Sequence, residues 1–165
     1  MNATTEAVRP VDRWFAAYAD DHRNPTNQLL HVICVPAIVW SLLAMLYVIP
    51  TPEFLRATLP QEGVIAGAAM GLALLFWLRM SWSLGVGILV LTVASFWLAA
   101  TLAAAFGATL LLIGAVAVFV VAWIGQFIGH HIEGKRPSFL TDLVYLLIGP
   151  PWVLAKAYRK WGLRY

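Results

Sequence analysis

The sequence predicts an all-α integral membrane protein, and three observations carry that prediction. Hydrophobic residues make up 61% of the 165 residues and charged residues only 12%, well below the ~25% charged fraction of a typical soluble domain. No Asp, Glu, Lys or Arg occurs between Met80 and Ile132. Several apolar runs reach the ~20 residues that a helix needs to cross a bilayer. We therefore expect one membrane domain over residues 1–165, with four transmembrane helices.

The N-terminal part predicts an interfacial helix followed by the first span. Residues 11–23 place three aromatic side chains on one helical face, which suits a membrane interface. This helix should end before Asn24, because Pro25 disfavours helical geometry in the residue that precedes it. Asn24 is then expected to cap the next helix, with Pro25 at its first position. The first span is expected at 28–49.

The second span is expected at 63–79, after a proline-rich polar loop. The uncharged run that follows would extend roughly 70 Å as one helix, too long for a single ~30 Å crossing. It should therefore fold back and give spans at 82–103 and 107–129. The sequence Gly-Pro-Pro interrupts the last apolar segment. For residues 138–162 we expect a broken helix that lies partly at the membrane interface.

The basic residues predict the orientation in the membrane. With four spans, ten of the eleven Lys and Arg residues fall on one side, and only Arg56 lies on the other. The positive-inside rule then places both termini in the cytoplasm. We expect a bacterial inner membrane rather than the endoplasmic reticulum. Nucleic acid is not an expected partner, because the basic residues lie where membrane topology places them.

The four histidines occur in two groups at the ends of the apolar region. His22 and His31 flank the start of the first span, and His130 and His131 end the fourth. Four spans bring both groups to the same face of the membrane. The Asn-Pro break between His22 and His31 allows these two side chains to converge. Asn27 precedes His31 by four residues and shares its helical face.

The second histidine group also contains a helical face of polar residues. Gln126, His130 and Glu133 are spaced i, i+4 and i+7. Three imidazoles and a carboxylate suit Fe(II), Zn(II) or Mn(II). The candidate ligands are His22, His31 and one of the adjacent pair His130 and His131, which point about 100° apart on a helix. Glu133, Asn27 and Gln126 could add a ligand or support one. Alternatively, the histidines are only interfacial anchors, and Glu133 pairs with Lys135 or Arg136.

Two blocks of sequence resemble a known family. "HRNPTNQLLHVICVP", with Tyr18 before it, and "WIGQFIGHHIEGKRPSFLTDLVYLLIGPPW" are similar to the signature blocks of a family of small membrane proteins. The matching residues are Tyr18, His22, Asn24, Pro25, Asn27, His31, Pro36, Gln126, Gly129, His130, Glu133 and Pro137. The chain departs from the pattern of the family's characterised fungal member in having one residue fewer between His130 and Glu133. His131 is not part of that pattern.

The resemblance implies an activity and a cofactor. The characterised fungal member of the family is an Fe(II)-dependent dioxygenase that shortens 2-hydroxy fatty acids by one carbon during phytosphingosine breakdown. The implied reaction here is the α-oxidation of a 2-hydroxy fatty acid by O₂, with Fe(II) at His22, His31 and His130. The acyl tail would lie between the helices or among the membrane lipids. Residues expected to attract the substrate carboxylate are Lys135, Arg136 and Arg23.

Two other functions remain open on the sequence. A zinc-dependent membrane lipid hydrolase would use the same histidines without consuming oxygen. A non-catalytic membrane scaffold or transporter would not need them. A transporter is disfavoured because the middle spans contain no charged residue, which proton and ion pathways usually require.

Overall fold

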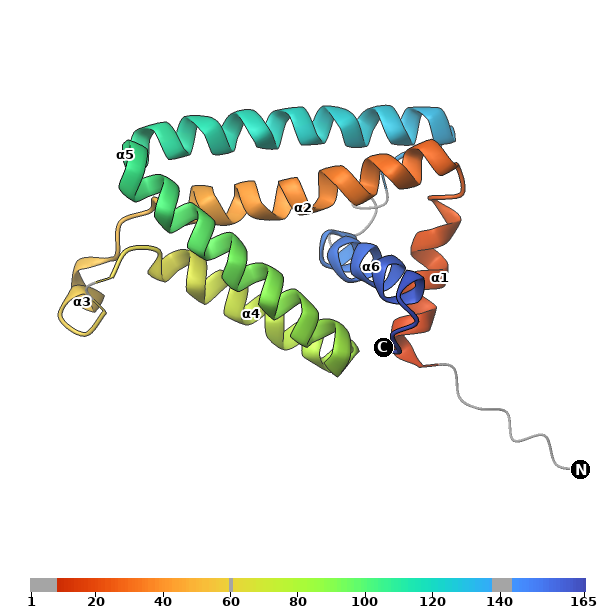
Figure 1. Ribbon diagram of the computed structural model, residues 1–165, viewed down its shortest axis with the longest axis horizontal. Helices are drawn as coiled ribbons and strands as arrows, with labels where there is room; N and C mark the ends of the chain where they lie inside the picture. The colour runs from red at the N-terminus through yellow and green to blue at the C-terminus, as the bar shows by residue number, and fades with distance from the viewer. Residues whose placement is uncertain (1–8, 60, 138–143) are drawn as a thin grey trace, which may run out of the picture.

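The computed structural model describes residues 9–59, 61–137 and 144–165, and all regular structure within these ranges is helical. The predicted all-α fold is therefore confirmed. The helices run in the order α1 (Pro10–Asp20), α2 (Pro25–Tyr47), α3 (Glu53–Arg56), α4 (Val64–Met80), α5 (Trp82–Glu133) and α6 (Val144–Lys160) (Figure 1). The first residues of the predicted 138–162 segment lie outside the described ranges.

Helix α5 is 52 residues long and folds back on itself at Gly107. The backbone there has φ 82° and ψ 159°, a conformation that glycine adopts without the steric cost a side chain would add. The first arm of α5 lies beside α4, and the second arm lies beside α2 (Figure 1). Near the turn the helices pack through buried residues that are mostly small, namely Leu43, Ala44, Tyr47, Ala66, Ala99, Leu111 and Ala115. Small residues allow such close approach of helices.

Two helices, rather than the four expected, are long and apolar enough to cross a membrane, namely α2 and α5. The predicted second span corresponds to α4, whose 17 residues extend only about 26 Å. The predicted third and fourth spans are the two arms of the single helix α5. The chain turns at one glycine with no intervening loop, so the two expected helices form one element.

The junction of α1 and α2 confirms the predicted cap. Asn24 Oδ1 accepts a hydrogen bond from the Thr26 N–H at 2.9 Å, and Pro25 opens α2. The non-helical backbone at Asn24 separates the two helices and lets α1 cross the end of α2 (Figure 1). The apolar face of α1 is buried against α6, where Phe15 and Tyr18 join a cluster that includes Trp152.

Helix α6 is continuous where a break was expected. Pro150 and Pro151 both lie inside it, and Pro151 has no N–H to donate to the carbonyl of Leu147. The indole N–H of Trp77 donates to that carbonyl instead, at 2.7 Å. The break expected at Gly-Pro-Pro is therefore absent within Val144–Lys160, because a side chain from α4 replaces one of the backbone hydrogen bonds that the prolines remove.

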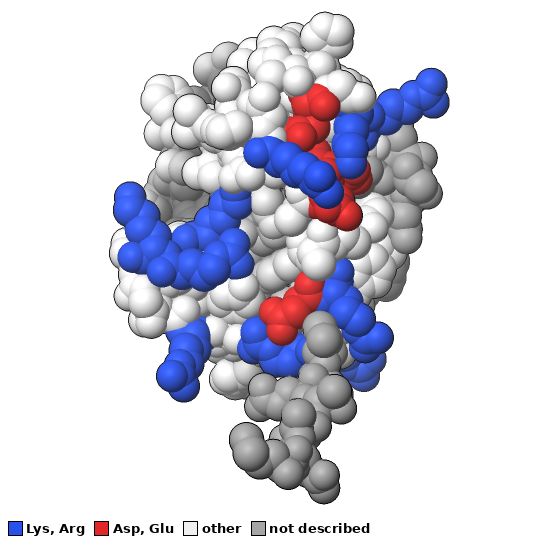
Figure 2. Space-filling model, turned by 90° about the vertical axis from the view of Figure 1, so that its right-hand side faces the viewer, with Lys and Arg blue, Asp and Glu red and all other residues white. Residues whose placement is uncertain are grey.

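The helix ends farthest from Gly107 gather at one end of the molecule. Helices α1 and α6, the start of α2 and the end of α5 meet there (Figure 1). Figure 2 shows Lys, Arg, Asp and Glu side chains collected over this end. We call it the histidine end, because His22, His31 and His130 lie within it. We call the opposite end, at Gly107, the apex.

Candidate metal centre

Three histidines from three segments converge at the histidine end. His22 follows α1, His31 lies in the second turn of α2, and His130 lies in the last turn of α5. One ring nitrogen from each lies within 4.8 Å of the others. Their exposed fractions are 1%, 1% and 4%. The structure thus brings together the three residues that the sequence identifies as candidate ligands.

Backbone carbonyls fix the orientation of two of these rings. The Nδ1 of His22 lies 2.5 Å from the carbonyl oxygen of Tyr18, and the Nδ1 of His31 lies 2.9 Å from that of Asn27. A carbonyl oxygen only accepts hydrogen bonds, so both Nδ1 atoms carry a proton. Metal-binding histidines are commonly held in this way by an acceptor at the second ring nitrogen.

The two remaining nitrogens face each other. The Nε2 atoms of His22 and His31 are 2.9 Å apart. In neutral rings that are protonated at Nδ1, both Nε2 atoms present lone pairs, and neither can donate to the other. Burial lowers the pKa of His22 to about 4, which opposes a proton in this gap at neutral pH. A metal cation that accepts both lone pairs fits this arrangement.

The third histidine also has a nitrogen available. His130 Nδ1 is buried and has no hydrogen-bond partner among the described residues. An unpaired buried polar atom costs free energy unless a ligand or water satisfies it. Aromatic rings surround the group, since Tyr18 stacks on His22 at 4.1 Å between ring centroids and Trp152 lies 5.3 Å from His22. These rings exclude water from one side of the histidines.

Glu133 connects the end of α5 to the break between α1 and α2. One carboxylate oxygen accepts from the Arg23 N–H at 3.0 Å. The other accepts from the Asn24 N–H at 2.8 Å and from the Asn27 side-chain amide at 3.1 Å. Both oxygens are therefore engaged in fixing the segment that carries His22 and His31. In this arrangement Glu133 supports the histidines rather than facing the gap between them.

Asn27 of α2 lies against Gly129 of α5. It is fully buried, and its backbone carbonyl orients His31 while its amide binds Glu133. A side chain at Gly129 would collide with Asn27 Oδ1. Glycine at this position therefore lets the end of α5 approach α2 closely enough for His130 to join the other two histidines.

An apolar cavity of about 220 Å³ adjoins His31 and His130. We call it the histidine cavity. Its walls come from α2, the second arm of α5 and α6, and include Ile38, Leu42, Phe119 and Leu146. Gln126 also lines it and is 5% exposed, and its Nε2 atom has no partner among the described residues. The cavity therefore offers a hydrogen-bond donor beside the histidines and hydrocarbon surface beyond them.

The other predicted residues lie outside this cavity. His131 is exposed and lies about 100° around the helix from His130. Lys135 binds the Asp21 carboxylate at 3.0 Å, and Arg23 binds Asp20 at 2.6 Å. Arg136 is exposed. These three cations lie on the charged face of the histidine end, and the structure does not place them among the residues that line the histidine cavity.

Two residues at the site were not identified as site residues from the sequence. Trp152 packs beside His22, and Lys156 lies 3.9 Å from the centroid of the Trp152 ring. Both belong to α6, whose approach to α1 and α2 depends on tertiary packing. Only the presence of Trp152 at the end of the second signature block could have drawn attention to it.

The fold and the site define a class of protein, namely an all-helical chain that holds three buried histidines at the end of an apolar cavity. The chain belongs to the family described as 2-hydroxy-palmitic acid dioxygenase Mpo1-like, whose family model matches residues 8–161. It is 28% identical over 134 residues to the 2-hydroxy-palmitic acid dioxygenase MPO1 of Saccharomyces cerevisiae. The aligned region covers 81% of this chain and 70% of the yeast protein. No solved structure matches the chain significantly.

Proposed function

We propose that this protein is an Fe(II)-dependent dioxygenase that shortens 2-hydroxy fatty acids by one carbon. The observation that carries the proposal is the pair of facing Nε2 atoms of His22 and His31, with His130 beside them, at the end of an apolar cavity. Membership of the Mpo1-like family and the similarity to the yeast enzyme support the substrate class. Histidine, with a position left open for substrate, suits non-haem iron.

The chemistry balances without a further reductant. A 2-hydroxy acid and one O₂ give the acid one carbon shorter, carbon dioxide and water. Bound Fe(II) would supply the redox centre for this oxidation, held by His22, His31 and His130. The chain itself holds two of these rings in one tautomer through the carbonyls of Tyr18 and Asn27. Because the ring orientation is fixed in advance, binding of the metal requires little reorganisation.

The histidine cavity orients the substrate in this proposal. The amide of Gln126 donates to an oxygen of the 2-hydroxy acid, because it is a buried donor with no partner among the described residues. Ile38, Leu42 and Phe119 contact the alkyl chain. An unsubstituted fatty acid lacks the hydroxyl group that completes recognition of the head. The site therefore discriminates by the polar head and tolerates variation along the chain.

The same proposal places the protein in a membrane with both termini in the cytoplasm. Two apolar helices support membrane insertion, and the gathering of charged residues over the histidine end supports its position at the surface (Figure 2). A long-chain acid would then enter from the bilayer with its carboxylate at the depth of the lipid headgroups. Lys135, Arg136 and Arg23 would attract that carboxylate to the surface.

The decisive experiment uses the purified chain loaded with Fe(II), with 2-hydroxypalmitate under ¹⁸O₂. We expect the acid one carbon shorter, with ¹⁸O in its carboxylate, and no product from palmitate. Metal analysis of protein purified without added metal should find iron. Zinc in place of iron, with no oxygen consumption, would favour the lipid hydrolase. A shortened acid that forms equally well without oxygen would contradict the dioxygenase proposal.

A further inference from the structure

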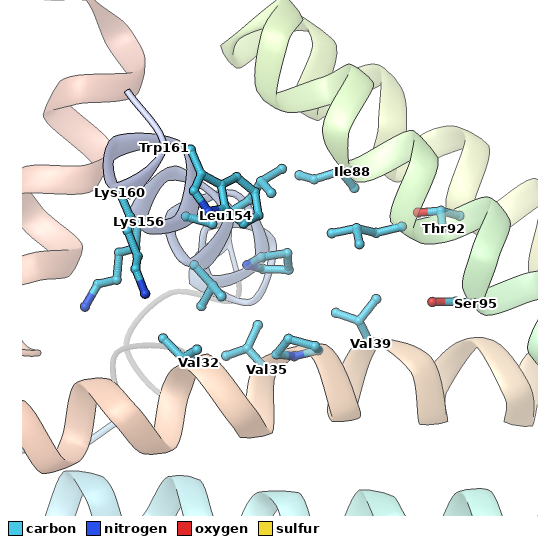
Figure 3. Close-up of a pocket in the computed structure, with 15 residues that line it drawn as sticks. Val32, Val35, Val39, Ile88, Thr92, Ser95, Leu154, Lys156, Lys160 and Trp161 are labelled. Carbon is cyan, nitrogen blue, oxygen red and sulfur yellow. The ribbon is translucent and has the colours of Figure 1, made fainter. Parts of the chain in front are cut away.

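A second and larger cavity lies on the other side of α2 from His130. It has a volume of about 590 Å³ and is formed by α2, the first arm of α5 and α6 (Figure 3). Its walls are mainly aliphatic and include Val32, Val35, Val39, Ile88 and Leu154. We call it the lysine groove, because Lys156 and Lys160 line one end. Its volume lies within the roughly 300–1,000 Å³ that is typical of sites for small molecules.

The two ends of the lysine groove differ in character. Lys156 and Lys160 are one helical turn apart on α6 and lie together at one end, whereas Thr92 and Ser95 lie at the other (Figure 3). No carboxylate occurs among the described residues that line the groove. The groove therefore combines a cationic end with a long apolar wall, which is complementary to an amphiphile with an anionic head.

Lys156 is held near neutral partners. Its Nζ donates to Gln28 Oε1 at 2.6 Å and lies 3.9 Å from the centroid of the Trp152 ring. Burial lowers the pKa of Lys156 to about 8. A partly buried ammonium group is stabilised when an anion binds beside it. A ligand carboxylate at this position would supply the charge that the surrounding protein lacks.

We propose that the lysine groove binds a long-chain fatty acid, with its carboxylate at Lys156 and Lys160 and its alkyl chain along α2 toward Ser95. The groove and the histidine cavity share Val35, Val39 and Pro150 as a common wall, but no histidine lines the groove. The groove is thus a separate site that holds the acid beside the metal centre. The choice of a fatty acid over a phospholipid rests on the proposed function, because that reaction consumes and releases long-chain acids.

The test is photo-crosslinking of the full-length, metal-loaded chain in nanodiscs of neutral lipid. The probe is a 16-carbon fatty acid with a diazirine near the end of its chain. We expect crosslinks on α5 near residues 88–95, and excess palmitate should prevent them. Lys156→Gln should reduce this labelling about tenfold, the loss expected for one charge-assisted hydrogen bond. The same probe with an alcohol in place of the carboxylate should label the wild-type groove about as weakly as the acid probe labels Lys156→Gln.

Two variants keep the result interpretable. Arg159→Gln removes a positive charge from an exposed residue of the same helix that does not line the groove, and it should label like the wild type. Ser95→Trp fills the far end of the groove and should block labelling, although both lysines remain. Helical circular dichroism and metal content confirm that each variant is folded.

The outcomes separate this inference from the proposed function. His31→Ala should lose the metal and still label the lysine groove, so the groove stands even if the dioxygenase proposal fails. Labelling confined to the Phe119 region, equal labelling by the alcohol, or no effect of Lys156→Gln would overturn the inference. Displacement of the probe by phosphatidylglycerol and not by palmitate would also overturn it, in favour of a phospholipid site.

Discussion

At the apex, α2 and α5 contact each other through Leu43, Ala44 and Ala115, whereas at the histidine end the same two helices meet through Asn27, His31 and His130. Each region is buried, so burial alone does not distinguish them. The apex buries hydrocarbon, which stabilises the fold through packing. The histidine end buries polar atoms, three of which, at Asn27, Gln126 and His130, have no partner among the described residues. A protein retains such a costly arrangement where a ligand completes it.

This difference predicts that substitutions at the two ends affect different measurements. At the histidine end, metal content and turnover should change more than stability. At the apex, stability should change while the metal content of each folded molecule stays the same.

We expect His31→Ala to abolish turnover of 2-hydroxypalmitate, with a loss of more than about 100-fold. Substitution of a residue that only supports a metal ligand typically lowers metal affinity or activity by about 10–100-fold, and loss of a ligand itself should lower it further. Bound iron per chain should fall in parallel while helical content remains. His131→Ala, at an exposed neighbour of His130, is the control and should keep both values within about twofold. Full iron content in His31→Ala would contradict the ligand assignment.

Glu133→Gln should weaken metal binding by about 10–100-fold. The carboxylate accepts three hydrogen bonds, from Arg23, Asn24 and Asn27. An amide of the same shape turns one of its acceptors into a donor that faces other donors. The measurement is iron affinity by competition with a chelator. Glu62→Gln, at an exposed acid outside the histidine end, should match the wild type, and an unchanged affinity in Glu133→Gln would show that Glu133 does not support the site.

Leu43→Ala should lower the free energy of unfolding by about 2–5 kcal/mol. Leu43 is fully buried at the apex, whereas Leu72 is 72% exposed, so Leu72→Ala should change stability by less than about 0.5 kcal/mol. Unfolding in detergent, followed by circular dichroism, gives both values. Iron per folded molecule should be unchanged in both variants. Loss of iron with normal stability in Leu43→Ala would contradict the separation between the two ends.

The sequence predicted those parts of the fold that depend on local patterns. Hydrophobic run length located α2, α4 and both arms of α5, and the Asn24-Pro25 pair located the start of α2. The continuity of α6 was not predictable, because Trp77 supplies a hydrogen bond from a residue 70 positions away. The structure has two candidate spans rather than four, because α4 has only 17 residues and the two arms of α5 are joined at Gly107 into one element.

For the candidate site, too, the sequence predicted the features that depend on local pattern and missed those that depend on tertiary contacts. His22, His31 and His130 were identified from their positions at the ends of apolar runs together with the family resemblance, and the structure brings their nitrogens together. The role of Glu133 depends on which donors face it, and spacing along α5 does not determine that. Trp152 and Lys156 enter the site because α6 packs against α1 and α2. Such contacts follow from tertiary structure and have no periodic pattern in the sequence.

The smallest effect is expected from neutralising the surface cations Lys135 and Arg136. Both are exposed, and Lys135 already binds the Asp21 carboxylate. Exposed charges attract a substrate over a distance, and salt screens that attraction beyond about 10 Å at 0.1 M ionic strength. The double variant Lys135→Gln/Arg136→Gln should therefore raise KM about two- to threefold at low salt, with kcat unchanged, and the difference should vanish at high salt. A salt-independent fall in kcat would instead place these residues in direct contact with the reacting acid, and would remove the distinction between the charged surface and the buried histidines.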